Sequence, residues 1–181
     1  MNGTPISLAG RAAELRQAFD RSFARPPALE AVRTEDYLAI RVAGNPYALR
    51  VAEIAGLFAD KVVTPVPSAL PALLGVFGLR GAIVPVYDLA VLLGHVAHVA
   101  QAAPRWLALA RSREPVALAF EAMEAQLAVS PQDVILEAGD AGAQARRRLR
   151  AEGAPRPIAE LPSLLDEIDR RVAAIRSTRE A

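Results

Sequence analysis

The chain is 181 residues long, with 52% hydrophobic and 23% charged residues and a net charge of +1 at neutral pH. This length allows one ordinary domain or two very small ones, with a buried core, and the composition is that of a globular protein rather than a disordered one. The near-zero charge provides no general attraction to nucleic acid or anionic lipid. The absence of cysteine excludes disulfides and thiolate chemistry.

Residues 7–25 are predicted to form an amphipathic helix. The apolar side chains that share one face recur every three or four residues, at Leu8, Ala12, Leu15, Phe19 and Phe23. This spacing is typical of a helix with one apolar stripe. Because its charges are mixed, the helix is expected to dock on the protein's own body or on a partner rather than on a membrane. With the linker that follows, it forms a predicted N-terminal region, residues 1–34.

Short segments rich in β-branched and aromatic residues predict strands after this linker. These segments are 37–42, 46–51, 61–67 and 81–89. The first two are expected to pair as a hairpin, because Gly44, Asn45 and Pro46 between them are turn residues. A single helical turn is expected over residues 88–94, with Gly94 at its end.

The pattern then occurs a second time. Residues 106–120 repeat the pattern of 37–51, residues 157–161 repeat 85–89, and 129–131 echo 63–65. One copy is too small to bury a complete core by itself, so two small packed β-barrels are the expected solution. Asp88 and Glu160 occupy equivalent positions in the two copies, and each is expected to cap the helical turn that follows it.

The second copy carries a basic segment. Arg146, Arg147, Arg148 and Arg150 surround Leu149 within residues 138–157. These arginines favour an exposed edge strand on which charge prevents edge-to-edge association. The alternative is a contact for an acidic partner.

A second helix is predicted over residues 162–177. Its apolar stripe has spacings of four, three, four and three, at Leu161, Leu165, Ile168, Val172 and Ile175. The helix is expected to pack on the barrels, since the stripe is too short to favour a coiled coil.

No catalytic or metal-binding constellation is present in the sequence. His95 and His98 have no cysteine or nearby carboxylate to complete a ligand set, so neither a metal nor another cofactor is expected. The glycines at positions 75, 78 and 81 do not match the phosphate-binding pattern, and they are expected to serve tight turns and close packing. The sequence therefore predicts that the protein is not an enzyme.

The most distinctive stretch is GVFGLRGAIVPVYDLAVLLG, residues 75–94. Arg80 and Asp88 are the only formal charges between Val62 and Pro104, and the prolines of this region exclude a membrane-spanning helix. The stretch resembles the signature of the CheW-like domain, roughly G-V-x-N-L-R-G-x-[IV]-[IVL]-P-[VI]-x-D-L. The resemblance extends from about Tyr37 to Leu165.

The resemblance implies a mainly β fold of two packed, small SH3-like five-stranded β-barrels. The predicted CheW-like domain covers residues 35–181, with a first barrel over 37–94, a second over 104–161 and the C-terminal helix over 162–177. The helix near the N-terminus is an addition to this minimal domain.

The resemblance also implies a non-catalytic, cytoplasmic adaptor of a bacterial chemosensory array. Its expected partners are the cytoplasmic tips of methyl-accepting chemoreceptors and the regulatory domain of a CheA-type histidine kinase, with no nucleic acid and no membrane insertion. The chain is expected to be a monomer in isolation.

By the same resemblance, Arg80, Ile54 and Gly75 occupy receptor-facing positions, and no kinase-binding residue is assigned. Without the resemblance, a solvated turn residue is the preferred interpretation of Arg80. Gly78 stands where the family has asparagine, and Gly56 stands where many members have an acidic residue, with Glu53 nearby.

Two alternatives remain open. One is a divergent scaffold or competitor that binds a single array component, or another partner through residues 7–25. The other is a small enzyme or ligand carrier, which would require a deep polar pocket with clustered ionisable groups.

Overall fold

The computed structural model describes residues 34–95, 105–137, 146–150 and 155–180. The chain divides into two units, Met1–Arg33 and Thr34–Ala181, and every described residue belongs to the second. The helix predicted over residues 7–25 lies outside the described residues.

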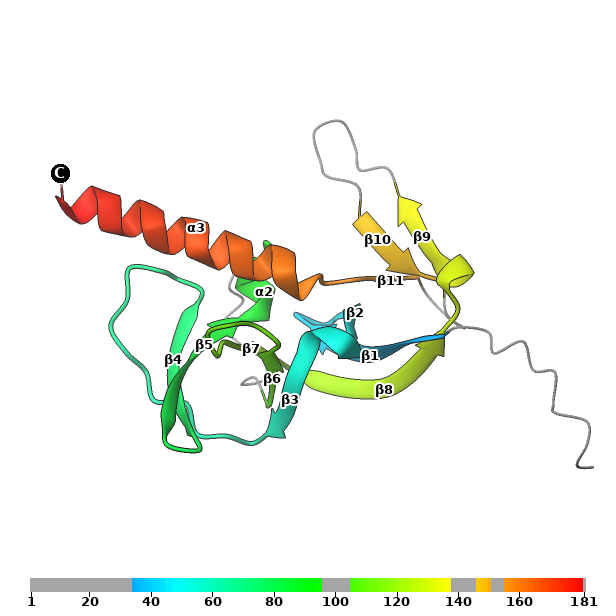
Figure 1. The fold of residues 1–181 in the computed structure, drawn as a ribbon, viewed down its shortest axis with the longest axis horizontal. Coiled ribbons are helices and arrows are strands. Elements are labelled where there is room, and N and C mark those ends of the chain that lie inside the picture. Colours follow the sequence, from blue (N-terminus) through cyan, green and yellow to red (C-terminus); the bar gives the residue numbers. More distant parts are fainter. Residues whose placement is uncertain (1–33, 96–104, 138–145, 151–154, 181) are drawn as a thin grey trace, which may run out of the picture. The chain divides into compact units, whose positions relative to one another are not determined.

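The described part is mainly β, with a long helix at the C-terminal end (Figure 1). The first strands are β1 Glu35–Val42, β2 Asn45–Arg50, β3 Ile54–Ala59, β4 Leu73–Leu79 and β5 Ala82–Asp88. The later strands are β6 Trp106–Ala110, β7 Ala117–Phe120, β8 Ala122–Val129, β9 Val134–Glu137, β10 Arg146–Leu149 and β11 Arg156–Pro157. The helices are α2 Leu89–Leu92 and α3 Leu161–Glu180, with 3-10 turns at Val51–Glu53 and Pro131–Asp133.

The sheets combine strands from both predicted halves of the chain. A five-stranded sheet has the order β3-β6-β7-β5-β4, and two three-stranded sheets have the orders β2-β1-β8 and β11-β10-β9. Within the first sheet, β5 pairs with β7 in parallel, whereas the other pairs are antiparallel. Strand pairing therefore crosses the boundary expected between a barrel over 37–94 and a barrel over 104–161. The repeat was read from local patterns, and a local pattern does not specify which strand is the partner.

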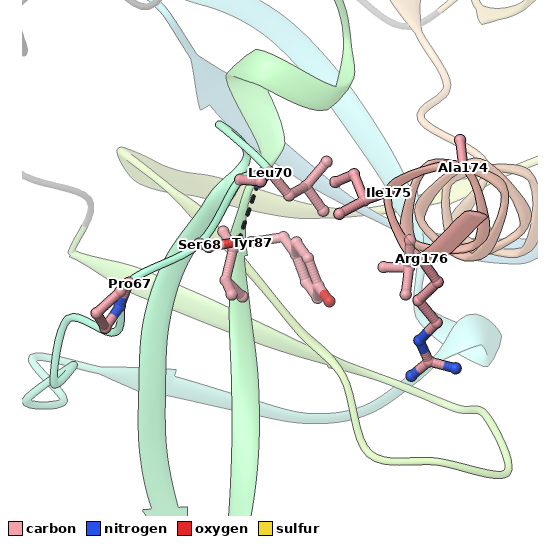
Figure 2. Close-up of a pocket in the computed structure, with 10 residues that line it drawn as sticks. Pro67, Ser68, Leu70, Tyr87, Ala174, Ile175 and Arg176 are labelled. Atoms are coloured by element: carbon pink, nitrogen blue, oxygen red, sulfur yellow. Dashed lines mark hydrogen bonds between the residues drawn. The ribbon is translucent and has the colours of Figure 1, made fainter. Parts of the chain in front are cut away.

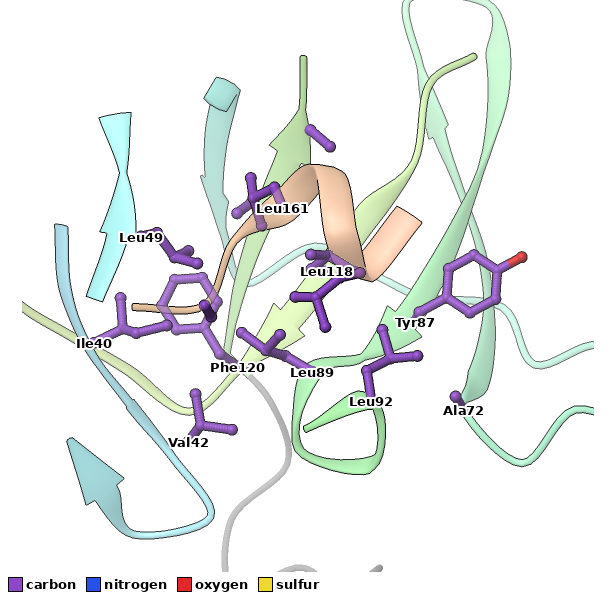
Figure 3. Packing of buried hydrophobic residues seen from close by; sticks show 14 of the residues in the cluster. Ile40, Val42, Leu49, Ala72, Tyr87, Leu89, Leu92, Leu118, Phe120 and Leu161 are labelled. Carbon is purple, nitrogen blue, oxygen red and sulfur yellow. The ribbon is translucent and has the colours of Figure 1, made fainter. Parts of the chain in front are cut away.

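The main core lies where α2 and α3 meet β1, β2 and β7 (Figure 3). Its fully buried large side chains include Ile40, Leu49, Leu89, Leu118, Phe120 and Leu161. Each such side chain contributes about 1.5–3 kcal/mol by leaving water. The α3 helix supplies Leu161, Leu164 and Ile168 to this core, while Val172 and Ile175 further along are half-buried. The expectation that the C-terminal helix packs on the domain is thus confirmed.

The two predicted caps have different outcomes. The Asp88 carboxylate accepts a hydrogen bond from the Ala90 N–H at 2.8 Å, as expected for an N-cap. The Glu160 side chain instead lies 3.8 Å from Arg147 and accepts from the Ser163 hydroxyl at 3.5 Å. The N–H of Leu161, at the start of α3, donates to Glu53 Oε2 at 3.0 Å. Glu160 was therefore the wrong residue for this end of α3.

Glu53 also belongs to a partly buried charged network. The Arg50 guanidinium lies 3.4 Å from Glu53 and 3.2 Å from Glu35, and it donates to the Tyr37 hydroxyl at 3.2 Å. The network joins β1, β2 and the 3-10 turn to the first residue of α3. A carboxylate that binds a helix N–H and a guanidinium together contributes more than an exposed ion pair does.

We predict that Glu53→Ala lowers the free energy of unfolding by about 1–3 kcal/mol, because it leaves the Leu161 N–H without its acceptor and removes one of the two carboxylates that pair with Arg50. Urea denaturation followed by circular dichroism measures the change. Glu114→Ala, at an exposed loop position, is the control and is expected to have little effect. Equal stability of the two variants would show that Glu53 does not anchor α3.

A bulge in β8 positions a second charged cluster. The register shifts between Ala39 and Ile40 of β1, which pair with Ala125 and Met123, so Glu124 is the additional residue on β8. Its carboxylate accepts from Arg41 and lies 2.7 Å from Arg156 of β11. Desolvation raises the pKa of Glu124, but the hydrogen bonds from Arg156 and Arg41 outweigh it and bring the pKa below its ordinary value.

The pKa of Glu124 is lower in the folded protein than its ordinary value of 4.5. The ionised carboxylate therefore stabilises the fold fully above about pH 4.5, and this stabilisation is lost as the pH falls through the pKa of the folded protein. We expect Glu124→Gln to lower the melting temperature at neutral pH, with a smaller difference in acid. Thermal unfolding at several pH values measures this, with Glu114→Gln as the control. A difference from wild type that does not change with pH would contradict the assignment.

Candidate functional site

The β4–β5 hairpin carries the arginine of the apolar stretch at its tip. Leu79 pairs with Ala82, and the two residues between them, Arg80 and Gly81, have φ angles of 49° and 84°. Positive φ at both central positions defines a type I′ turn, the connection that fits the twist of a two-residue hairpin. Arg80 is exposed to solvent.

The turn itself does not require arginine. Asn, Asp and Gly are the usual residues in the left-handed region, and other residues there are strained by about 1–2 kcal/mol. The β1–β2 hairpin makes the same turn with Ala43 and Gly44, whose φ angles are 48° and 74°. Within the described residues, the Arg80 side chain makes no hydrogen bond or ion pair. Its charge is therefore displayed outward and is not used by the fold.

An apolar side chain of this hairpin is unusually exposed. Ile83 is 75% exposed and lies opposite Gly78 across the hairpin. Val62, in the segment after β3, is 85% exposed. The alternation along β5 explains Ile83, because Val84 and Val86 point into the core and their neighbour points out. The sequence reading missed Ile83, although this period of two was a signal that could have identified it.

Gly75 has a structural explanation. It sits at a register shift in β4 with a φ of 151°, and an added Cβ would lie 2.2 Å from the carbonyl oxygen of Thr64. Thr64 and Val76 exchange two backbone hydrogen bonds of 2.8 and 2.9 Å, which hold the two segments together. Glycine at this position thus permits close packing, and the position is buried. Contact of Gly75 with a receptor stays a prediction.

Ile54 opens β3 and is half-buried against the main core, with its carbonyl accepting from Arg111 at 3.2 Å. The sheet order places β3 at one edge and β4 at the other. Gly75 and Arg80 therefore share one strand and its turn, while Ile54 belongs to the opposite edge strand. A receptor-facing role for Ile54 also stays a prediction.

We predict that Gly75→Ala destabilises the protein by about 2–4 kcal/mol, through the clash with Thr64 and the strained φ. Gly78→Ala on the same strand is the matched control, because a Cβ there meets nothing within 4 Å. Replacing a strand glycine in open space is expected to be neutral or slightly stabilising. Urea denaturation of both variants makes the comparison, and a tolerated Gly75→Ala would disprove the packing account.

Among the described residues, no group of three or more His, Cys, Asp or Glu side chains could hold a metal ion. His95 binds the Tyr47 hydroxyl through Nε2 at 2.8 Å, and the two rings meet edge to face, so the predicted structural role fits the geometry. His98 lies outside the described residues. No helix in the described ranges is long and apolar enough to cross a membrane.

The fold and this surface define a small β domain with a charged tip on an exposed apolar hairpin. The family model described as CheW-like domain matches residues 36–154. The chain belongs to the CheW-like domain family, as the signature indicated. A search of curated protein sequences finds no match.

Solved structures are similar in fold. The crystal structure of the scaffolding protein TtCheW from Thermoanaerobacter tengcongensis has a TM-score of 0.59 and 15% sequence identity to this chain. The match covers 70% of this chain and 88% of that one. It supports the mainly β architecture with its C-terminal helix.

Proposed function

We propose that this protein is a non-catalytic adaptor of a chemosensory array, which couples chemoreceptor tips to the regulatory domain of a CheA-type histidine kinase. Family membership over residues 36–154 and the fold shared with a scaffolding protein support this function. The observation that carries it is the hairpin turn, which places the exposed Arg80 in a left-handed conformation for which the turn itself does not require arginine.

We also propose that the sheets close into two small barrels with exchanged strands. The parallel bridge between Ala48 and Ile158 joins β2 to the segment after β11, which connects the two three-stranded sheets. The bridge between Thr64 and Val76 brings the chain after β3 back to β4, at the other edge of the five-stranded sheet. One barrel would contain β3 to β7, and the other the remaining strands.

The receptor is proposed to dock on the β4–β5 hairpin. Its exposed apolar side chain, Ile83, would contact apolar residues of a receptor helix, and Arg80 would fix the register through an acidic group. Ile54 and Gly75 belong to the same proposed receptor site, Gly75 by shaping the backbone. The kinase is proposed to associate barrel to barrel, at residues that are not assigned. The protein is proposed to act in the cytoplasm and to be monomeric in isolation.

Three variants test the docking site. Arg80→Ala is expected to weaken receptor binding about tenfold, and Arg80→Glu to weaken it further, because a charged group at an anchor position is lost or reversed. Arg80→Asn creates the Asn-Gly pair that type I′ turns prefer, so it is expected to weaken binding while keeping or raising stability. Calorimetric titration with a receptor signalling fragment measures affinity, and thermal unfolding measures stability.

The control is Arg113→Ala, which removes another exposed arginine from the β6–β7 loop and is expected to leave receptor binding unchanged. Kinase binding is expected to persist in all four variants. If the three Arg80 variants bind the receptor as wild type does, Arg80 serves only the turn.

The alternative of a divergent scaffold that binds one component rests on Gly78, where the family has asparagine. Because Gly78 is exposed with open space around it, packing does not explain the missing side chain. Binding to the kinase without binding to the receptor, or the reverse, would favour this alternative. A partner bound through residues 7–25 would show itself as binding that is lost when those residues are deleted.

A further inference from the structure

A groove lies between the C-terminal half of α3 and the segment that leads into β4 (Figure 2). Its volume is about 810 Å³, and the large apolar side chains that line it are Pro67, Leu70, Leu73, Tyr87, Val172 and Ile175. Val172 and Ile175 are only half-buried, so this part of α3 keeps apolar surface that another element can cover. None of the residues proposed to bind the receptor lines this groove.

Two opposite charges flank Val172 on α3. Arg176 lines the groove, and Asp169 lies seven residues before it on the same helix. Seven residues make about two turns, so the two side chains share one helix face about 10 Å apart along the axis. Burial raises the pKa of Tyr87, and the charge of Asp169 raises it further, which agrees with a position of Asp169 beside the groove.

These two charges are not used within the helix. Both positions are exposed, and within the described residues neither side chain makes a hydrogen bond or an ion pair. They are too far apart to pair with each other, because pairs within a helix join residues three or four apart. Arg170 and Arg171 form such pairs, both with Glu167. The α3 side of the groove therefore presents apolar side chains between one negative and one positive charge.

This pattern is complementary to itself when a second copy of α3 lies antiparallel beside the first. A two-fold axis between Val172 and Ala173 places Asp169 of each copy opposite Arg176 of the other, and every contact then occurs twice. An apolar ligand would match neither charge, and a ligand of one sign would match only one. The charges therefore favour a second copy of this chain as the occupant.

We propose that the C-terminal half of α3 docks antiparallel in this groove of a second copy, with two reciprocal ion pairs between Asp169 and Arg176 around the apolar side chains of Val172 and Ile175. The contact covers about two helical turns, less than a stable dimer interface needs. The chain is therefore monomeric in dilute solution and pairs as its concentration rises, with a dissociation constant on the order of 100 μM. This pairing does not rest on the proposed receptor and kinase contacts.

Sedimentation equilibrium of the full-length chain, from about 10 μM to about 1 mM, tests the proposal. Asp169→Arg sets positive charges against each other, and Arg176→Asp sets negative charges against each other. Each variant alone is expected to associate at least about tenfold more weakly than wild type. An equimolar mixture of the two variants is expected to restore the dimer, because both ion pairs then join opposite charges again.

The controls are Asp166→Arg and Arg170→Asp, which reverse exposed charges on the other side of α3 and are expected to associate as wild type does. Circular dichroism establishes that each variant is folded. A wild type that stays monomeric throughout the concentration range overturns the proposal and leaves the groove to another occupant. The proposal is also overturned if the Asp169 and Arg176 variants associate as wild type does, or if their mixture associates no better than each variant alone.

Discussion

The pairing of strands across the two halves of the chain is the constraint on which the rest of the structure depends. β1 lies between β2 and β8, and β7 lies between β6 and the parallel strand β5. Each main sheet is therefore complete only when distant segments have met. The core that α3 covers contains side chains from both halves, such as Leu49 and Leu118. A second cluster, in which Phe77 and Val84 of the signature hairpin pack with Leu107 of β6, holds that hairpin in place.

Much of this fold could be predicted from local patterns in the sequence. Turn residues and strand periodicity located the β1–β2 hairpin and strand β5, Asp88 was correctly predicted as a cap, and the stripe beginning at Leu161 predicted a packed helix. Strand β4 was not predicted, and the strand expected over residues 61–67 is only an isolated bridge at Thr64. Strand partners between the two halves could not be predicted, because alternation indicates which side of a strand is buried and nothing about a distant neighbour. The choice of Glu160 rather than Glu53 as the cap of α3 failed for the same reason, since Glu53 meets Leu161 only through the fold.

The candidate site shows a similar division. The sequence signature singled out Arg80 as a candidate binding residue. Its left-handed backbone, and its lack of a hydrogen bond or ion pair within the described residues, are properties of the folded hairpin. Gly75 differs from Arg80, because the fold alone explains the residue: the carbonyl of Thr64 leaves no room for a side chain at position 75. A position that matches a family's binding surface can thus be required first by backbone packing. The groove between Tyr87 and α3 could not be predicted from the sequence, because its walls come from three separate segments of the chain.

Strand pairing between the two halves of the chain also has a consequence during synthesis. A nascent chain that has emerged only as far as α2 contains β1 and β5 without β8 and β7, the strands that pair with them later. Two strand edges then remain open until the ribosome has produced most of the domain, and such edges are sites of aggregation. Folding is expected to be post-translational or chaperone-assisted, because the contacts that complete each sheet are far apart in the sequence.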